Sequence, residues 1–321
     1  MRAGIKNLLI AILFGLILPG ILLNGILKSE PQPATEATVP TQTEPAVGLL
    51  IPVLTAENQM QLMDLEDYVT GVLLREIPSD FHHEAMKAQA VAARTYALRR
   101  YLGASKHENA SVCTDPSCCQ AFQSPETYIT EGGSQAGLRQ IRKAVQDTAG
   151  EVLYYGGSLI EATYFSSSGG MTEAAVAVWG QDIPYLQATE SPGEEDAAHH
   201  TDTVTFTWEE ISDKLNFSLF GTPESRFTDI RYTVGGGVES LRICNECYTG
   251  KQLRELLGLR STAFSIYPSE DNVSFVTRGY GHRVGMSQYG ADAMARSGSN
   301  YRQILSYYYK DTEIGDCGAI Q

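Results

Sequence analysis

The chain has few basic residues relative to its acidic ones: 24 lysines and arginines stand against 38 aspartates and glutamates in 321 residues. The formal net charge of −14 argues against a nucleic-acid partner, because phosphate backbones are bound by basic surfaces. No internal repeat is visible. Hydrophobic residues make up 43% of the chain, which is ordinary for a globular protein with a sizeable core.

The sequence also lacks the Gly-x-Ser-x-Gly turn that exposes a nucleophilic serine. The nearest stretch, residues 166–170, reads Ser-Ser-Ser-Gly-Gly. We interpret it as a loop whose hydroxyls, including that of Ser167, approach a polar ligand such as a sugar, with a flexible turn as the alternative. No other complete pair of nucleophile and base stands out, so a serine hydrolase is disfavoured.

The N-terminal part contains a long apolar run, residues 8–27, of roughly the length that spans a bilayer. Arg2 and Lys6 precede it, which predicts a cytoplasmic N-terminus and an extracytoplasmic remainder. A cleaved signal peptide is the alternative, but no small-x-small cleavage site closes the run. Residues 29–47 are rich in Pro, Thr, Glu and Ala and are predicted to form a disordered linker. The predicted organisation is therefore a cytoplasmic stub and transmembrane anchor (1–28), a linker (29–47) and an extracytoplasmic domain (48–321).

Residues 65–76 have the apolar spacing of one helical face, and Asp64 is a suitable N-cap. This helix must end near Glu76, because Ile77 precedes a proline and is pushed out of the α region. A second helix is predicted to start at a Ser79 or Asp80 cap and to end before Gly103.

Further along the chain, a hairpin is predicted at residues 151–165 around Gly156 and Gly157, and helices are predicted near 138–148, 251–257 and 287–296. A last helix opens at Asn300 with a capping box. The elements do not alternate regularly, which indicates an α+β fold of helices and antiparallel hairpins.

Glu76 is the main catalytic candidate. At a helix C-terminus the backbone carbonyls carry partial negative charge, which favours a protonated carboxyl and raises its pKa. Such a group is suited to act as a general acid, and one carboxylic acid is enough to cleave a glycosidic bond. The alternative is a surface glutamate paired with Arg75.

The six cysteines leave two interpretations open. His107, Cys113 and Cys119 are closely spaced in a turn-rich loop, with Cys118 between them, and this donor set suits tetrahedral Zn²⁺. Adjacent cysteines are awkward as simultaneous ligands, so the fourth ligand stays open. Disulfides outside the cytoplasm are the alternative. The remaining cysteines, Cys244, Cys247 and Cys317, receive no function.

Several polar residues could position a substrate. Gln89, Arg94 and Tyr96 lie on the second predicted helix. His282 and Gln288 lie in or just after a glycine-rich stretch, where His282 could orient a polar group of the substrate or support Glu76; a purely structural histidine is the alternative.

Three segments in combination, residues 75–98, 107–122 and 279–298, resemble the stage II sporulation protein D family. The resemblance covers about residues 48–312 and extends to the anchor and linker. It implies a lytic transglycosylase that cleaves the β-1,4 bond between N-acetylmuramic acid and N-acetylglucosamine and leaves a 1,6-anhydro end. The glutamate of the family's Arg-Glu-x-Pro motif falls on Glu76, and Ile77 stands where methionine is common.

The resemblance also implies a zinc ion, expected to be structural, on His107, Cys113 and Cys119. The family often has a histidine where this chain has Cys118. Implied partners are peptidoglycan glycan strands, a cell-wall amidase and other membrane-anchored sporulation proteins at the sporulation septum. The same family includes amidase enhancers, so a non-catalytic glycan-binding enhancer is the alternative. A zinc hydrolase is a third possibility.

Overall fold

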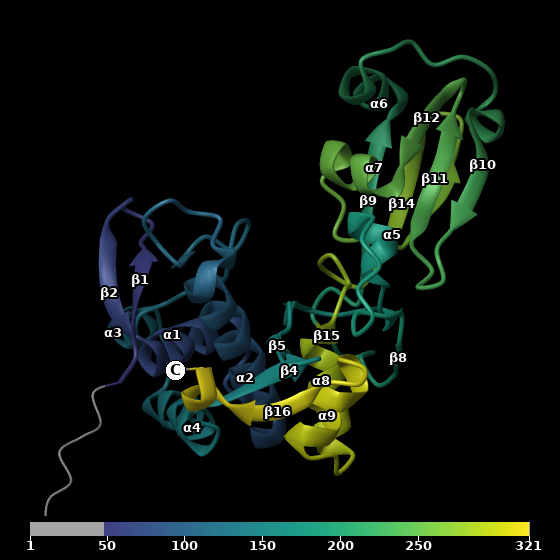
Figure 1. Ribbon diagram of the computed structural model, residues 1–321. Helices are drawn as coiled ribbons and strands as arrows, with labels where there is room; N and C mark the ends of the chain where they lie inside the picture. Colours follow the sequence, from purple (N-terminus) through teal and green to yellow (C-terminus); the bar gives the residue numbers. More distant parts are fainter. Residues whose placement is uncertain (1–47, 321) are drawn as a thin grey trace, which may run out of the picture. The chain divides into compact units, whose positions relative to one another are not determined.

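A computed structural model describes residues 48–320 (Figure 1). The predicted anchor and linker therefore lie outside the described residues. Within residues 48–320, none of the helices combines the length and the apolar character needed to cross a membrane. Helices and short, mostly antiparallel sheets are mixed along the chain, in agreement with the predicted α+β class.

The helix that carries Glu76 forms as predicted. Helix α1 (Leu65–Glu76) begins at Asp64, whose carboxylate accepts hydrogen bonds from the backbone N–H groups of Glu66 and Asp67. It ends at Ile77, which is extended, with φ −127° and ψ 146°. The proline that follows thus fixes Glu76 as the last helical residue.

The second helix starts later than predicted. Helix α2 (His83–Arg99) is capped by His82, whose Nδ1 accepts from the Glu84 N–H. The predicted caps Ser79 and Asp80 are wrong because residues 79–81 form a turn between the two helices. A wider turn, Arg100–Ala104, follows α2 and contains Gly103 at φ 118°.

The first hydrophobic core surrounds α2. Alanines along α2 are almost completely buried and let neighbouring helices approach closely, namely α1, α4 (Gln135–Asp147), α8 (Gln288–Arg296) and α9 (Tyr301–Tyr308). The predicted capping box at Asn300 opens α9. Two small sheets complete this core, β2 (Met60–Asp64)–β1 (Leu50–Leu54)–β3 (Val112–Cys113) and β16 (Glu313–Asp316)–β4 (Glu151–Tyr155)–β5 (Ser158–Leu159).

A second hydrophobic core lies between residues 201 and 278. Its aromatic centre, Phe206, Phe264 and Phe275, packs edge to face. It is built from the sheets β10 (Phe227–Tyr232)–β11 (Val238–Ile243)–β12 (Glu246–Thr249) and β13 (Phe264–Pro268)–β14 (Asn272–Arg278)–β9 (Thr201–Thr207), with α6 (Trp208–Leu215) and α7 (Gly250–Leu257).

The segment after the predicted hairpin turn differs from expectation. Gly156 and Gly157 do form the turn, both at positive φ, and β5 pairs with β4. The strand predicted to continue to Phe165 is instead interrupted, and β6 (Tyr164–Phe165) pairs in parallel with β15 (Met286–Ser287). This long-range pairing joins the serine loop to the glycine-rich stretch. The remaining elements are α3 (Pro125–Thr130), α5 (Ala175–Trp179), β7 (Gly170–Met171), β8 (Glu190–Ser191) and two 3-10 turns, Pro223–Arg226 and Cys317–Ile320.

Candidate active site

Glu76 lies in the wall of a cleft of about 1080 Å³. The cleft is bounded by the end of α1, the end of α2, residues 116–120, residues 161–166, the end of α5, residues 280–282 and the start of α8. Segments from distant parts of the sequence therefore converge around one carboxyl group.

Two hydrogen bonds hold the Glu76 carboxyl. Its Oε1 accepts from the backbone N–H of Ala121 at 3.0 Å, and its Oε2 accepts from Nε2 of Gln288 at 3.2 Å. Burial raises the pKa of Glu76, while these hydrogen bonds and the Arg75 charge oppose that rise. The carboxyl group is thus held in one orientation and keeps its proton to a higher pH than an exposed glutamate does.

A buried polar network lies next to Glu76. Gln120 donates from Nε2 to the Tyr164 hydroxyl at 2.8 Å and accepts from the Tyr68 hydroxyl at 3.2 Å. Burial raises the pKa of both tyrosines well above the usual range, so both hydroxyls stay neutral. Gln120 also precedes Ala121 in the chain, so the network fixes the peptide that donates to Glu76.

Three of the predicted substrate-positioning residues line the cleft, namely Tyr96, His282 and Gln288. Burial lowers the pKa of His282 to about 4, with the Arg254 charge acting in the same direction, so its imidazole is neutral near neutral pH. Its Nδ1 accepts from the Val284 N–H at 3.0 Å. His282 can therefore orient a polar group but carries no charge.

The structure does not bring the other three to the cleft. Arg94 is fully buried, donates to the Glu66 carboxylate and to the Glu151 carbonyl, and holds α2 against its neighbours. Gln89 is also buried and lies outside the cleft lining. Ser167 is buried and forms a backbone bridge with Tyr280, and its neighbour Ser166 lines the cleft instead. These placements give no support to direct substrate contacts by Gln89, Arg94 or Ser167.

Several cleft residues have no obvious sequence signal. Trp179 ends α5, and its ring lies 5.5 Å from that of His282, centroid to centroid. Tyr280 is 37% exposed at the same rim. Glu161 is the second carboxylate in the lining, but Arg99 and Arg100 both pair with it. The scarcity of tryptophan, two in the chain, is the one hint that sequence reasoning could have used for Trp179.

The cysteine loop forms a compact cluster beside the cleft. Ligand atoms of His107, Cys113, Cys118 and Cys119 all lie within 4.8 Å of one another. Nε2 of His107 is 3.4 Å from Sγ of Cys119 and 3.6 Å from Sγ of Cys118, and the two sulfurs are 3.9 Å apart. All six cysteines are free thiols, so the disulfide alternative finds no support.

These separations fit the chemistry of a tetrahedral zinc site. With Zn–S bonds of about 2.3 Å and Zn–N bonds of about 2.0 Å, tetrahedral geometry places two sulfurs roughly 3.8 Å apart and a sulfur and a nitrogen roughly 3.5 Å apart. A helical turn, in which the Cys118 and Cys119 N–H groups both donate to the Asp115 carbonyl, lets the adjacent thiols face the same imidazole. Cys118 is therefore the candidate for the fourth ligand position, which sequence reasoning left open.

Fold and cleft together define an α+β protein in which a hydrogen-bonded glutamate at a helix end lies beside a His/Cys cluster. The family model described as "Stage II sporulation protein" matches residues 55–155. The chain is 37% identical over 284 residues to stage II sporulation protein D of Bacillus subtilis (strain 168), covering 87% of this chain and 82% of that protein. It is 36% identical to stage II sporulation protein D of Bacillus amyloliquefaciens over 88% of this chain and 83% of that protein. The chain belongs to the stage II sporulation protein D family.

A more distant relative has a different name. The amidase enhancer of Bacillus subtilis (strain 168) is 29% identical over 299 residues, covering 76% of this chain and 40% of that protein.

Proposed function

We propose that the protein is a peptidoglycan lytic transglycosylase that cleaves the bond between N-acetylmuramic acid and N-acetylglucosamine during sporulation. The observation that carries this proposal is the state of Glu76: a cleft-lining carboxyl whose pKa is raised by burial and whose two oxygens are fixed by Ala121 and Gln288. A general acid at neutral pH requires both the orientation and the retained proton.

In the proposed reaction, protonated Glu76 donates its proton to the glycosidic oxygen as the C1–O bond breaks and positive charge develops on the muramyl ring. The resulting Glu76 carboxylate then accepts the proton of the muramyl 6-hydroxyl, whose oxygen bonds to C1. The products are a new N-acetylglucosamine hydroxyl and a 1,6-anhydro muramyl end, and Glu76 regains its proton.

The second cleft carboxylate does not fit a two-carboxylate hydrolase. Glu161 is held by the guanidinium groups of both Arg99 and Arg100, one on each carboxylate oxygen. This pairing occupies both oxygens and weakens Glu161 as an acid, a base or a nucleophile. Glu76 acting first as an acid and then as a base accounts for the reaction without a second catalytic carboxylate.

The charges of the cleft suit an anionic glycan. Three of its cationic side chains, Arg75, Lys106 and Arg254, have no carboxylate partner among the residues that the structure describes. The lactyl group of each muramyl residue ends in a carboxyl, either free or at the head of a stem peptide. Trp179 and Tyr280 at the rim offer faces on which sugar rings can stack.

We further propose that His107, Cys113, Cys118 and Cys119 hold a structural zinc ion, on the basis of the separations given above. All four donors come from the protein, so the site is closed, as structural zinc sites are. The metal would fix the turn that leads into Gln120 and Ala121, and the proposed chemistry involves no step at the metal.

The proposed location is outside the cytoplasmic membrane at the sporulation septum, with residues 8–27 as the anchor, and the proposed partners include a cell-wall amidase. A non-catalytic enhancer is the second candidate, favoured by the name of the amidase-enhancer relative.

Digestion of defined glycan strands by the purified protein, followed by mass spectrometry, tests the proposal. A lytic transglycosylase yields ends that are lighter by one water molecule than hydrolysed ends. Hydrolysed ends would indicate a hydrolase, whereas binding without new ends would support the enhancer.

A further inference from the structure

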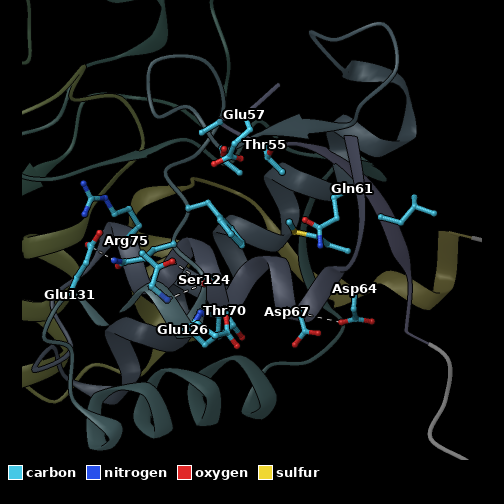
Figure 2. Close-up of a pocket in the computed structure, with 18 of the residues that line it drawn as sticks. Thr55, Glu57, Gln61, Asp64, Asp67, Thr70, Arg75, Ser124, Glu126 and Glu131 are labelled. Atoms are coloured by element: carbon cyan, nitrogen blue, oxygen red, sulfur yellow. Dashed lines mark hydrogen bonds between the residues drawn. The ribbon is translucent and has the colours of Figure 1, made fainter. Parts of the chain in front are cut away.

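A second cleft, of about 750 Å³, lies between the β1–β2 hairpin, the start of α1 and the segment leading into α3 (Figure 2). Four consecutive residues of strand β2, residues 61–64, line it. Side chains of a strand alternate between two faces, so four consecutive lining residues mean that the cleft also reaches the backbone of β2.

The hydrogen bonds of the neighbouring strand show which backbone groups of β2 are free. In β1, the carbonyls of Pro52 and Leu54 accept from the N–H groups of Ser111 and Thr114, and so point toward the β3 side. Pro52 has no N–H, and its partner in the β1–β2 register is Leu62. The Leu62 N–H and carbonyl therefore point away from β1, toward the open edge of the sheet.

Strand β2 is an edge strand in the part of the chain that the structure describes, because the order of its sheet is β2-β1-β3. It is also unusually apolar for an exposed edge, with Met60 60% and Leu62 63% exposed. Exposed apolar edges are normally blunted by charges or bulges, since they template pairing with another strand. Among residues 48–320, nothing covers this edge, which lies beside a cleft.

The cleft is acidic, which restricts the strand that could pair there. Five carboxylates surround it, against the guanidinium groups of Arg75 and Arg142; the five are Glu57, Asp64, Asp67, Glu126 and Glu131 (Figure 2). A second copy of this chain carries a formal charge of −14 and would be repelled. The chain's own residues 29–47 contain three glutamates and no lysine or arginine, so they are equally unsuited.

We propose that the β2 edge and this acidic cleft form a docking surface for an extended, lysine- or arginine-bearing segment of a partner protein. The segment adds a strand to the sheet through the free backbone groups of Leu62, and its cationic side chains face the carboxylates. The proposal does not rest on the glycan chemistry: Arg75 lines both clefts, but Glu76 is not part of this surface, and the variants used below leave both residues unchanged.

The test uses two fluorescent peptides of three Lys-Val or three Glu-Val repeats, with binding followed by fluorescence anisotropy at low salt. Leu62→Pro removes the free N–H without breaking a bond of the existing ladder, and proline is compatible with an edge strand. Leu62→Thr is the matched control, because it trims the side chain and keeps the N–H. We expect the Lys-Val peptide to bind the wild type and Leu62→Thr. Binding to Leu62→Pro should be weaker by at least about fivefold, which corresponds to one lost hydrogen bond of about 1 kcal/mol.

A second variant removes charge without touching the backbone. Glu57 and Glu126 are exposed, and the double change Glu57→Gln, Glu126→Gln should weaken Lys-Val binding by more than about twofold while leaving the thermal transition unchanged. The proposal is overturned if Lys-Val binds no better than Glu-Val, if neither peptide binds, or if folded Leu62→Pro binds as tightly as Leu62→Thr. Should Leu62→Pro not fold, the charge variant decides, and unchanged binding then refutes the proposal.

Discussion

Replacing Glu76 by glutamine removes the acidic proton of this side chain but keeps its shape. The amide oxygen can still accept from the Ala121 N–H, and Gln288 can turn its own amide to accept from the new NH₂ group. The cleft should therefore keep its form while losing its acid. General acid–base catalysis contributes about 10²–10⁴ in rate, so Glu76→Gln should lose about 3–5 kcal/mol of transition-state stabilisation.

The assay is release of anhydro-ended muropeptides from purified glycan strands, with glycan binding measured in parallel. Glu161→Gln is the control, because it makes the same change in the other cleft carboxylate. Glu161→Gln should change substrate binding more than turnover, since it frees the guanidinium groups of Arg99 and Arg100 in the cleft wall. Equal loss of turnover in both variants, or release by Glu76→Gln at the wild-type rate, would refute the one-acid mechanism.

The same variant makes a prediction about stability. A carboxyl whose pKa is raised in the folded state binds its proton more tightly there than in the unfolded chain. Its contribution to the free energy of unfolding is therefore greatest at low pH and is lost as the pH rises through the folded-state pKa. The thermal unfolding temperature of Glu76→Gln should rise relative to that of the wild type as the pH rises. Turnover of the wild type should fall over the same pH range. A stability difference that is independent of pH would contradict the raised pKa.

Three further predictions concern the surroundings of the site. On acidification from the ordinary histidine pKa of 6.5 to about 4, His282→Gln should lose less stability than the wild type. The wild type loses stability because its imidazole is neutral when folded and takes up a proton on unfolding. The difference in unfolding free energy, measured by denaturant titration, approaches about 3 kcal/mol. Treatment with a strong chelator should remove the proposed zinc ion, lower the thermal transition and speed amide exchange at residues 118–122, whereas unchanged exchange would argue against the metal site. Gly71→Ala should destabilise the protein by roughly 1–3 kcal/mol and reduce turnover, because the added Cβ would lie 2.1 Å from the Phe122 ring. An unchanged unfolding free energy in calorimetry would show that this ring has room to move.

The local features of the fold were predictable from sequence where neighbouring residues determine them. The Asp64 cap and the Ile77-Pro78 stop bound α1 correctly, and with it the place of Glu76. The capping choice before α2 was wrong, since a histidine nitrogen can replace the usual hydroxyl or carboxylate as acceptor and no propensity rule ranks it first.

The long-range features were not predictable in this way. The strand expected at residues 159–165 divides between two partners, and its second half pairs with residues more than a hundred positions away. Arg94 was expected to position a substrate from the second predicted helix, but tertiary packing points it at Glu66 instead. Trp179 reaches the cleft from the end of α5, a helix of five residues that is too short to show a hydrophobic periodicity.

The segment from Cys118 to Gln123 explains why the acid and the His/Cys cluster occur together. Cys118 and Cys119 supply two thiols of the cluster. The following residues lie along α1: Gln120 binds the Tyr68 hydroxyl, Phe122 stacks on the Tyr68 ring at 5.7 Å, and the Gln123 N–H donates to the Gly71 carbonyl. The Ala121 N–H lies between these contacts and reaches Glu76. The direction of a backbone N–H cannot be adjusted by a change of rotamer, so the orientation of the Ala121 N–H depends on both ends of the segment being held in place. The aromatic and glycine contacts hold one end against α1, and the proposed zinc ion on the His/Cys cluster would hold the other.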